Sequence, residues 1–191
     1  MSILLKNGSL KGEKNVDILI ENDKISKVAP ANSLKDDKAE VIDLTGLIIL
    51  PGLVDLHTHL REPGREDAET VATGSAAAAR GGFTAVHAMA NTLPVADTAG
   101  VVEQVWNLGK SIGLVDVYPV GAVTIGLKGE NLAELSAMAD STARVRIFSD
   151  DGHCVSDPVL MRRALEYVKA FNGVIAQHAQ EPRLTKNAQM N

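Results

Sequence analysis

The sequence predicts an α/β protein in which a small β-sheet unit precedes a run of alternating strands and helices. Two observations lead to this prediction. Residues 1–50 contain short apolar segments separated by polar turns, without a helical pattern, which indicates a separate β domain. In residues 51–191, apolar runs alternate with segments whose apolar residues recur at helical spacing, which is typical of a parallel sheet with helices. We therefore predict two domains, divided near residue 50.

Composition excludes several classes of function. Hydrophobic residues make up 45% and charged residues 23%, as in a globular protein. The net charge of −5 comes without any basic block, so we expect no nucleic acid and no membrane surface as partner. We find no leader and no apolar run that could span a bilayer. The single cysteine, Cys154, cannot form an intrachain disulfide, and we expect a cytoplasmic protein.

In the β domain, apolar alternation predicts five short strands, with a turn at Asn7-Gly8 and another at residues 21–23. The predicted strands cover residues 3–5, 16–20, 24–28, 41–44 and 47–49. A polar connector spans residues 30–38. We see no catalytic residues in this part of the chain.

The second domain is expected to contain about five strand–helix units. The strands are predicted at residues 52–59, 83–90, 114–124, 144–148 and 174–177. The first helix is expected to have the acids of residues 66–69 in its first turn and to end at Gly81-Gly82. Further helices are expected at residues 99–112 and 131–138. Asp157 and Pro158 are expected to start the last one, with Leu160, Ala164, Leu165 and Val168 on its buried face.

Two histidines stand at the end of the first strand of this domain. Because side chains alternate along a strand, Asp55, His57 and His59 share one face. Imidazoles at positions i and i+2 can both reach one divalent cation such as zinc. The alternative is that they are ordinary polar residues at a strand end. The acid before them and the Arg-Glu-Pro-Gly after them favour a metal site.

The run Asp-Leu-His-Thr-His-Leu-Arg-Glu-Pro-Gly (residues 55–64) closely resembles the metal-binding signature of the dihydroorotases, in the amidohydrolase superfamily. Its last five residues resemble the longer-chain (type I) branch, and the likeness recurs at residues 90–92, 148–152 and 177–179. The resemblance implies an amidohydrolase-type (β/α)8 TIM barrel with a small flanking β-sheet domain. A complete barrel takes about 250 residues, so we expect an amino-terminal portion with about five units.

The resemblance also implies a binuclear zinc centre. His57 and His59 would hold the more buried ion, His178 the second, and Asp151 would bridge them. Such a centre would polarise an amide carbonyl and activate a bridging water. Strand alternation alone leaves Asp150 and Asp151 equally possible, and the family's Asp-Asp-Gly selects Asp151. The plainer alternative for residues 150–152 is an acidic turn, and for His178 it is a hydrogen-bonded histidine of the core.

For the substrate, Arg61 is a candidate partner of a carboxylate, which a guanidinium grips with a planar fork. The family resemblance adds a hydrogen bond from Asn91 to the same group. The alternative for Arg61 is a surface ion pair with Glu62 or Glu66.

Some family features have no counterpart in the span. The general acid/base aspartate and one more histidine ligand of the family fall beyond Asn191. We therefore expect no catalytic residue here and no activity from this span alone. His87 and His153 match no family ligand. Cys154 as a nucleophile or metal ligand is a further alternative that zinc chemistry does not require.

The resulting expectation is a zinc-dependent dihydroorotase that interconverts N-carbamoyl-L-aspartate and L-dihydroorotate in pyrimidine (UMP) biosynthesis. One alternative is an allantoinase or hydantoinase, but these usually bridge their metals with a carboxylated lysine, and no lysine follows the fourth strand. The other is a non-catalytic partner of aspartate transcarbamoylase. A homo-oligomer or a complex with that enzyme is possible.

Overall fold

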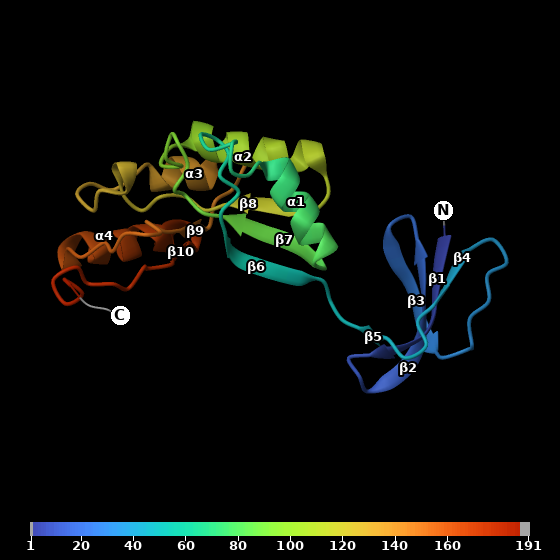
Figure 1. The fold of residues 1–191 in the computed structure, drawn as a ribbon. Coiled ribbons are helices and arrows are strands. Elements are labelled where there is room, and N and C mark those ends of the chain that lie inside the picture. The colour runs from blue at the N-terminus through green and yellow to red at the C-terminus, as the bar shows by residue number, and fades with distance from the viewer. Residues whose placement is uncertain (1, 188–191) are drawn as a thin grey trace. The chain divides into compact units, whose positions relative to one another are not determined.

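The structure is a computed structural model that describes residues 2–187 (Figure 1). The chain divides between Pro51 and Gly52 into two compact units. No described helix has both the length and the apolar character needed to traverse a lipid bilayer.

The amino-terminal unit is a five-stranded sheet. Its strands are β1 (Ser2–Leu10), β2 (Lys14–Glu21), β3 (Lys24–Pro30), β4 (Glu40–Asp43) and β5 (Ile48–Ile49). β1, β2 and β3 are antiparallel neighbours, whereas β4 and β5 both pair in parallel with β1. The predicted turn at residues 21–23 is confirmed, since Asn22 and Asp23 adopt the positive φ angles that a tight hairpin requires.

The turn predicted at Asn7-Gly8 is wrong, because β1 continues through it. The pairing of β1 with β2 shifts between Leu5 and Gly8, and Asn7 has a φ of 57°, so the two residues form a β-bulge. Asp17, fully buried, stabilises the bulge by accepting a hydrogen bond from the Asn7 amide at 3.0 Å. Asparagine adopts positive φ more readily than most residues, and here Asn7 does so inside a strand.

The carboxyl-terminal unit contains five parallel strands in chain order. β6 (Leu53–Thr58), β7 (Phe83–Ala88) and β8 (Asp116–Pro119) form one sheet, and β9 (Ile147–Phe148) pairs with β10 (Val174–Ile175). A parallel bridge between Gly121 and Phe148 connects the segment after β8 to β9. The carboxyl ends of these strands therefore lie toward the same edge.

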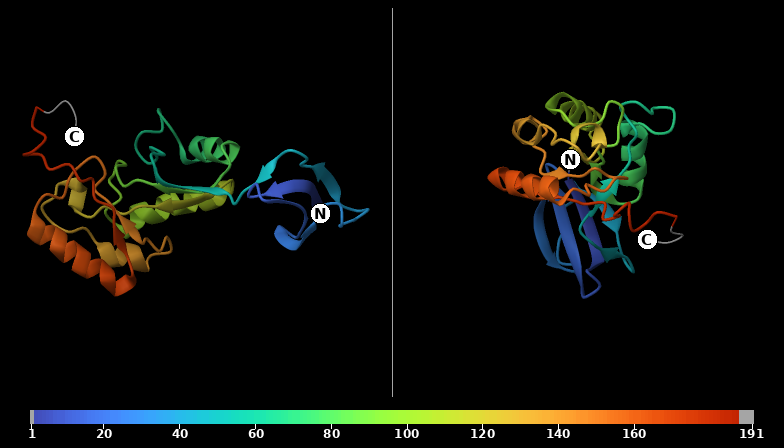
Figure 2. Two further views of the ribbon diagram at one scale, coloured as in Figure 1. Left: turned by 90° about the horizontal axis from the view of Figure 1, so that it is seen from below. Right: turned by 90° about the vertical axis from the view of Figure 1, so that its left-hand side faces the viewer.

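Helices α1 (Val71–Arg80) and α2 (Ala99–Ile112) lie along one face of β6, β7 and β8 (Figures 1 and 2). Val71 and Val105 from the helices and Val86 and Val117 from the strands are at most 2% exposed and belong to one apolar cluster. Gly109 permits the close contact of α2 with β8, because a Cβ there would lie 2.5 Å from the Cβ of Val117.

The remaining elements are α3 (Leu135–Asp140), α4 (Pro158–Val168) and the single turns η1 (Ile125–Leu127) and η2 (Lys169–Phe171). α2 matches its predicted range. Asp157 caps α4 as predicted and accepts hydrogen bonds from the amides of Val159 and Leu160 at 2.7 and 3.0 Å. Leu165 is 46% exposed, so its predicted burial is wrong.

The first helix was predicted to begin too early. α1 starts at Val71, and the acids of residues 66–69 precede it. Thr70 and Thr73 form a reciprocal capping box, which satisfies the first free amides and fixes the helix start. The last three strands are shorter than predicted: β8 begins later and ends earlier, β9 begins later, and β10 ends earlier.

Candidate metal centre

The candidate site lies where β6 and β9 end. His57 belongs to β6, His59 is the first residue beyond it, and Asp151 is the third residue after β9. Although more than 90 positions separate the histidines from the aspartate in sequence, the parallel strand order brings them to one edge of the sheet.

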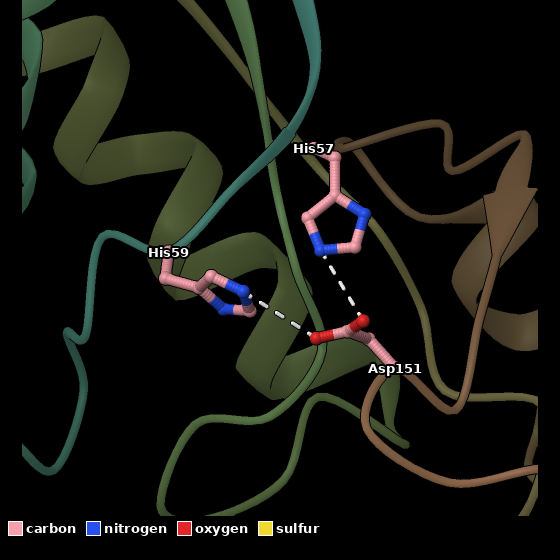
Figure 3. Close-up of side chains that lie close together, drawn as sticks. All are labelled: His57, His59 and Asp151. Atoms are coloured by element: carbon pink, nitrogen blue, oxygen red, sulfur yellow. Dashed lines mark ion pairs between the residues drawn. The ribbon is translucent and has the colours of Figure 1, made fainter. Parts of the chain in front are cut away.

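The three side chains converge (Figure 3). Nε2 of His57 lies 3.2 Å from Oδ1 of Asp151, and Nε2 of His59 lies 3.4 Å from Oδ2. One ligand atom from each residue lies within 4.8 Å of the others. The side chains of His57, His59 and Asp151 are 54%, 28% and 11% exposed, so the cluster is open on the His57 side.

Neighbouring groups hold the histidine strand in place. Oδ1 of Asp55 accepts a hydrogen bond from the amide of His57 at 3.0 Å. Thr58 donates its hydroxyl to the carbonyl of His87 at 2.9 Å, which ties the end of β6 to β7. His87 itself stacks on Tyr118, with ring centroids 5.3 Å apart, and lies outside the cluster.

Asp150 and Asp151 serve different purposes although they are adjacent. The carboxylate of Asp150, 1% exposed, accepts hydrogen bonds from the amides of Val123 and Thr124 at 2.8 and 3.0 Å and from the Thr124 hydroxyl. It thereby fixes the segment after β8, while Asp151 faces the histidines. Sequence reasoning overlooked this role of Asp150, and its only signal was the acid pair itself.

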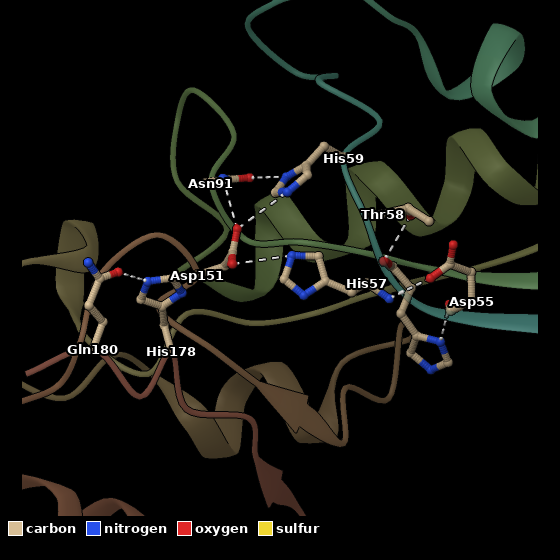
Figure 4. Close-up of polar contacts among 9 residues, drawn as sticks. Asp55, His57, Thr58, His59, Asn91, Asp151, His178 and Gln180 are labelled. Atoms are coloured by element: carbon tan, nitrogen blue, oxygen red, sulfur yellow. Dashed lines mark hydrogen bonds and ion pairs between the residues drawn. The ribbon is translucent and has the colours of Figure 1, made fainter. Parts of the chain in front are cut away.

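Asn91 lies between two members of the cluster (Figure 4). Its Oδ1 is 3.0 Å from Nδ1 of His59, and its Nδ2 donates to Oδ2 of Asp151 at 3.3 Å. The predicted substrate residue is thus in direct contact with the predicted metal ligands.

His178 is not part of the compact group. Its Nε2 is 2.8 Å from Oε1 of Gln180, a partner that the sequence analysis did not identify (Figure 4). The cluster found among residues 2–187 contains His57, His59 and Asp151 only, so the expected convergence of four ligands is not observed. β10 ends at Ile175, and His178 follows on the loop beyond it.

Arg61 follows the histidine pair and is exposed. Its alternative role in a surface ion pair is not observed in the described residues: Glu62 accepts from the amide of Val71, and Glu66 from that of Gly64. Arg61 has a φ of 61°, in the left-handed region that residues other than glycine rarely adopt.

A cavity of about 390 Å³ lies beside the segment that follows Asp151. It is lined in part by Lys128, His153, Cys154 and His178. The Cys154 sulfur accepts a hydrogen bond from Nε2 of Gln177 at 3.3 Å. No group of possible ligands in the described chain includes this thiol, so nothing here favours Cys154 as a metal ligand.

The donor set of the cluster fits a divalent cation. Two imidazole nitrogens and a carboxylate are typical zinc ligands. Nδ1 of His59 faces an amide oxygen and must donate to it, so Nε2 presents a lone pair toward the oxygens of Asp151. A divalent cation between Nε2 of His59 and the Asp151 oxygens would bind both as ligands.

Comparison with known proteins identifies the family. Residues 46–191 match the family model described as Dihydro-orotase-like. The chain belongs to this family. It is 63% identical over 188 residues to a dihydroorotase of Streptomyces coelicolor, which covers 98% of this chain and 44% of that protein. It is 75% identical over 153 residues to a dihydroorotase of Leifsonia xyli, covering 80% of this chain and 35% of that protein. A dihydroorotase of Mycobacterium tuberculosis is 57% identical over 189 residues, which cover 98% of this chain and 44% of that protein.

Solved structures show the same fold at low identity. The L-hydantoinase (dihydropyrimidinase) of Arthrobacter aurescens superposes with a TM-score of 0.72 at 22% identity, over 91% of this chain and 39% of that one. A dihydropyrimidinase of Brevibacillus agri superposes with a TM-score of 0.68 at 22% identity, over 98% of this chain and 43% of that one. The dihydroorotase-like chain therefore shares its fold with part of each of these structures. It spans less than half the length of the curated relatives named above.

Proposed function

We propose that the protein is a dihydroorotase that interconverts N-carbamoyl-L-aspartate and L-dihydroorotate in cytoplasmic pyrimidine synthesis. The observation that supports this best is the convergence of His57, His59 and Asp151 in a chain whose relatives are named dihydroorotase. We further propose that residues 52–191 supply about five units of the barrel and residues 1–51 its flanking sheet.

In this proposal, His57, His59 and Asp151 hold zinc in a binuclear centre, and His178 joins them as ligand of the second ion. Bound there, zinc would polarise the ring amide and activate water. Asp151 faces His57 with Oδ1 and His59 with Oδ2, which suits a ligand of the ion that these histidines would hold, and as a bridge it would have to turn one oxygen toward the second ion. His178 would have to exchange Gln180 for the metal.

We propose that Arg61 binds the carboxylate of dihydroorotate and that Asn91 assists it. The side chain of Arg61 is exposed, and its left-handed backbone is a form of strain that often accompanies functional positions. The planar guanidinium would fix the orientation of the carboxylate through two parallel hydrogen bonds. Proton transfer is assigned to an aspartate that has no counterpart among residues 1–191.

The two alternative functions, a hydantoinase and a non-catalytic partner protein, have less support. A hydantoinase function is supported only by a likeness of fold at 22% identity. A non-catalytic partner of aspartate transcarbamoylase would have no need for converging metal ligands. Association of this protein with itself or with that enzyme remains a separate proposal.

The test uses the natural full-length chain loaded with zinc, with dihydroorotate, allantoin and hydantoin as substrates. We expect turnover of dihydroorotate alone. His57→Ala should lower zinc affinity and activity at least ~100-fold, since even outer partners of metal ligands matter 10- to 100-fold. His153→Ala, an exposed histidine near the same loop, serves as the matched control. Preferred turnover of hydantoin, or full activity of His57→Ala, would refute the proposal.

A further inference from the structure

Asn91 contacts two of the proposed metal ligands, in addition to its proposed contact with the substrate. It follows β7, whereas His59 follows β6 and Asp151 follows β9. Its carboxamide contacts both of these residues, at 3.0 and 3.3 Å, and is the one side chain in the described structure that hydrogen-bonds to two members of the cluster (Figure 4).

The contacts of Asn91 determine its own orientation. An ionised Asp151 can only accept hydrogen bonds, so the amide must present its NH2 group there. The opposite orientation would place the amide oxygen against a carboxylate oxygen. The carbonyl oxygen of Asn91 therefore faces Nδ1 of His59, as the 3.0 Å contact shows.

This orientation in turn determines the tautomer of His59. An amide oxygen carries no proton, so Nδ1 of His59 must be the donor. In a neutral imidazole the other nitrogen, Nε2, then keeps its lone pair. Nε2 is the nitrogen that faces Asp151, at 3.4 Å.

We infer that Asn91 is a positioning residue that holds His59 in the Nδ1–H tautomer and ties it to Asp151, so that both ligands are set for one cation before it binds. The inference rests on the proposed metal centre. It assigns Asn91 a role that is independent of the substrate carboxylate, since the second N–H of its amide remains available to a ligand.

The experiment compares Asn91→Ala, Asn91→Asp and a matched control, Asn107→Ala, in the natural full-length chain. Asn107 is exposed on α2 and far in sequence from every ligand. Long-range proton–nitrogen correlation spectra of histidine-labelled, metal-free protein at pH 8 report the tautomer, with His59 assigned through His59→Gln. Zinc affinity is measured by competition with a chromophoric chelator.

We expect the Nδ1–H pattern of His59 in the unsubstituted protein and in Asn107→Ala. Asn91→Asp keeps an oxygen that accepts from Nδ1 and should keep the pattern, but it replaces the N–H that reaches Asp151 by a second carboxylate oxygen, so it should bind zinc more weakly. Asn91→Ala should lose this pattern and bind zinc ~10- to 100-fold more weakly. An unchanged pattern, or an unchanged zinc affinity, in Asn91→Ala would overturn the inference. If the unsubstituted protein binds no zinc, the proposed metal centre fails, and the metal-free spectra still decide the tautomer. The signals of His87, which stacks on Tyr118, report in each sample whether the protein is folded.

Discussion

Replacing Asp150 by alanine should strongly destabilise the carboxyl-terminal unit. The carboxylate is 1% exposed and accepts from two backbone amides and one hydroxyl, and Val123 and Thr124, which donate to it, are also buried. Alanine would leave both amides without a partner in a region that water does not reach.

The magnitude follows from those two amides. A buried donor left unsatisfied costs about 1–3 kcal/mol, so Asp150→Ala should lower the free energy of unfolding by about 2–6 kcal/mol. This is a large share of the ~5–15 kcal/mol that stabilises a typical domain. Asp150→Asn keeps an oxygen for the amides and loses the charge, so its cost should be smaller, about 1–2 kcal/mol.

Urea unfolding of the natural full-length chain, followed by circular dichroism, measures these differences. Asp140→Ala is the matched control, because Asp140 is exposed at the end of α3, and such sites change stability by less than ~0.5 kcal/mol. Thr124→Val completes a double-mutant cycle, since the Thr124 hydroxyl contacts both Asp150 and the amide of Gly129. A cost below ~1 kcal/mol for Asp150→Ala, or strict additivity with Thr124→Val, would refute the reasoning.

Two further predictions concern the other unit and the substrate. Burial raises the pKa of Asp17, but hydrogen bonds from the amides of Asn7, Leu34 and Asn32 outweigh it and lower the pKa below the usual value. The resulting stability is complete above pH ~4 and is lost as the pH falls through the lowered pKa. Asp17→Asn should remove that pH dependence in acid unfolding curves, and an unchanged curve would contradict this. Arg61→Lys should lower kcat/KM for dihydroorotate ~10-fold or more, because an ammonium cannot form the planar fork, whereas Arg80→Lys on α1 should leave it unchanged. Equal kinetics of Arg61→Lys and the unsubstituted enzyme would show that Arg61 is peripheral.

Local signals in the sequence predicted the positions of most elements. Helical spacing of apolar residues gave the range of α2, and the Asp-Pro pair gave the start of α4. The start of α1 was missed because Thr70 and Thr73 cap one another, and a Thr-Thr capping box is a weaker pattern than a run of acids. Asn7-Gly8 was misread because Asn7 adopts the positive φ of a turn residue inside a bulged strand.

The sequence was enough to predict the histidine pair of the candidate site, but not the contacts that the other site residues make. Strand alternation could not distinguish Asp150 from Asp151, since that choice depends on contacts with Val123 and Thr124, which lie 26 or 27 positions away. The link from Asn91 to His59 spans 32 positions and equally leaves no local pattern. Resemblance to a family supplied the identity of the residues, and the fold supplied their contacts.

The adjacent residues Asp150 and Asp151 have two different roles in the site, one structural and one in contact with the histidines. Asp150 fastens the loop after β9 to the segment after β8, while Asp151 reaches the histidines at the end of β6. Loosening Asp150 should therefore disturb the zinc site as well as stability. A bound ion, in turn, would stabilise the folded strands by about 4 kcal/mol at a thousand times its Kd. Asp17 lies in the other compact unit, where it accepts hydrogen bonds from the amides of Asn7 and Leu34, so its substitution should leave zinc affinity unchanged.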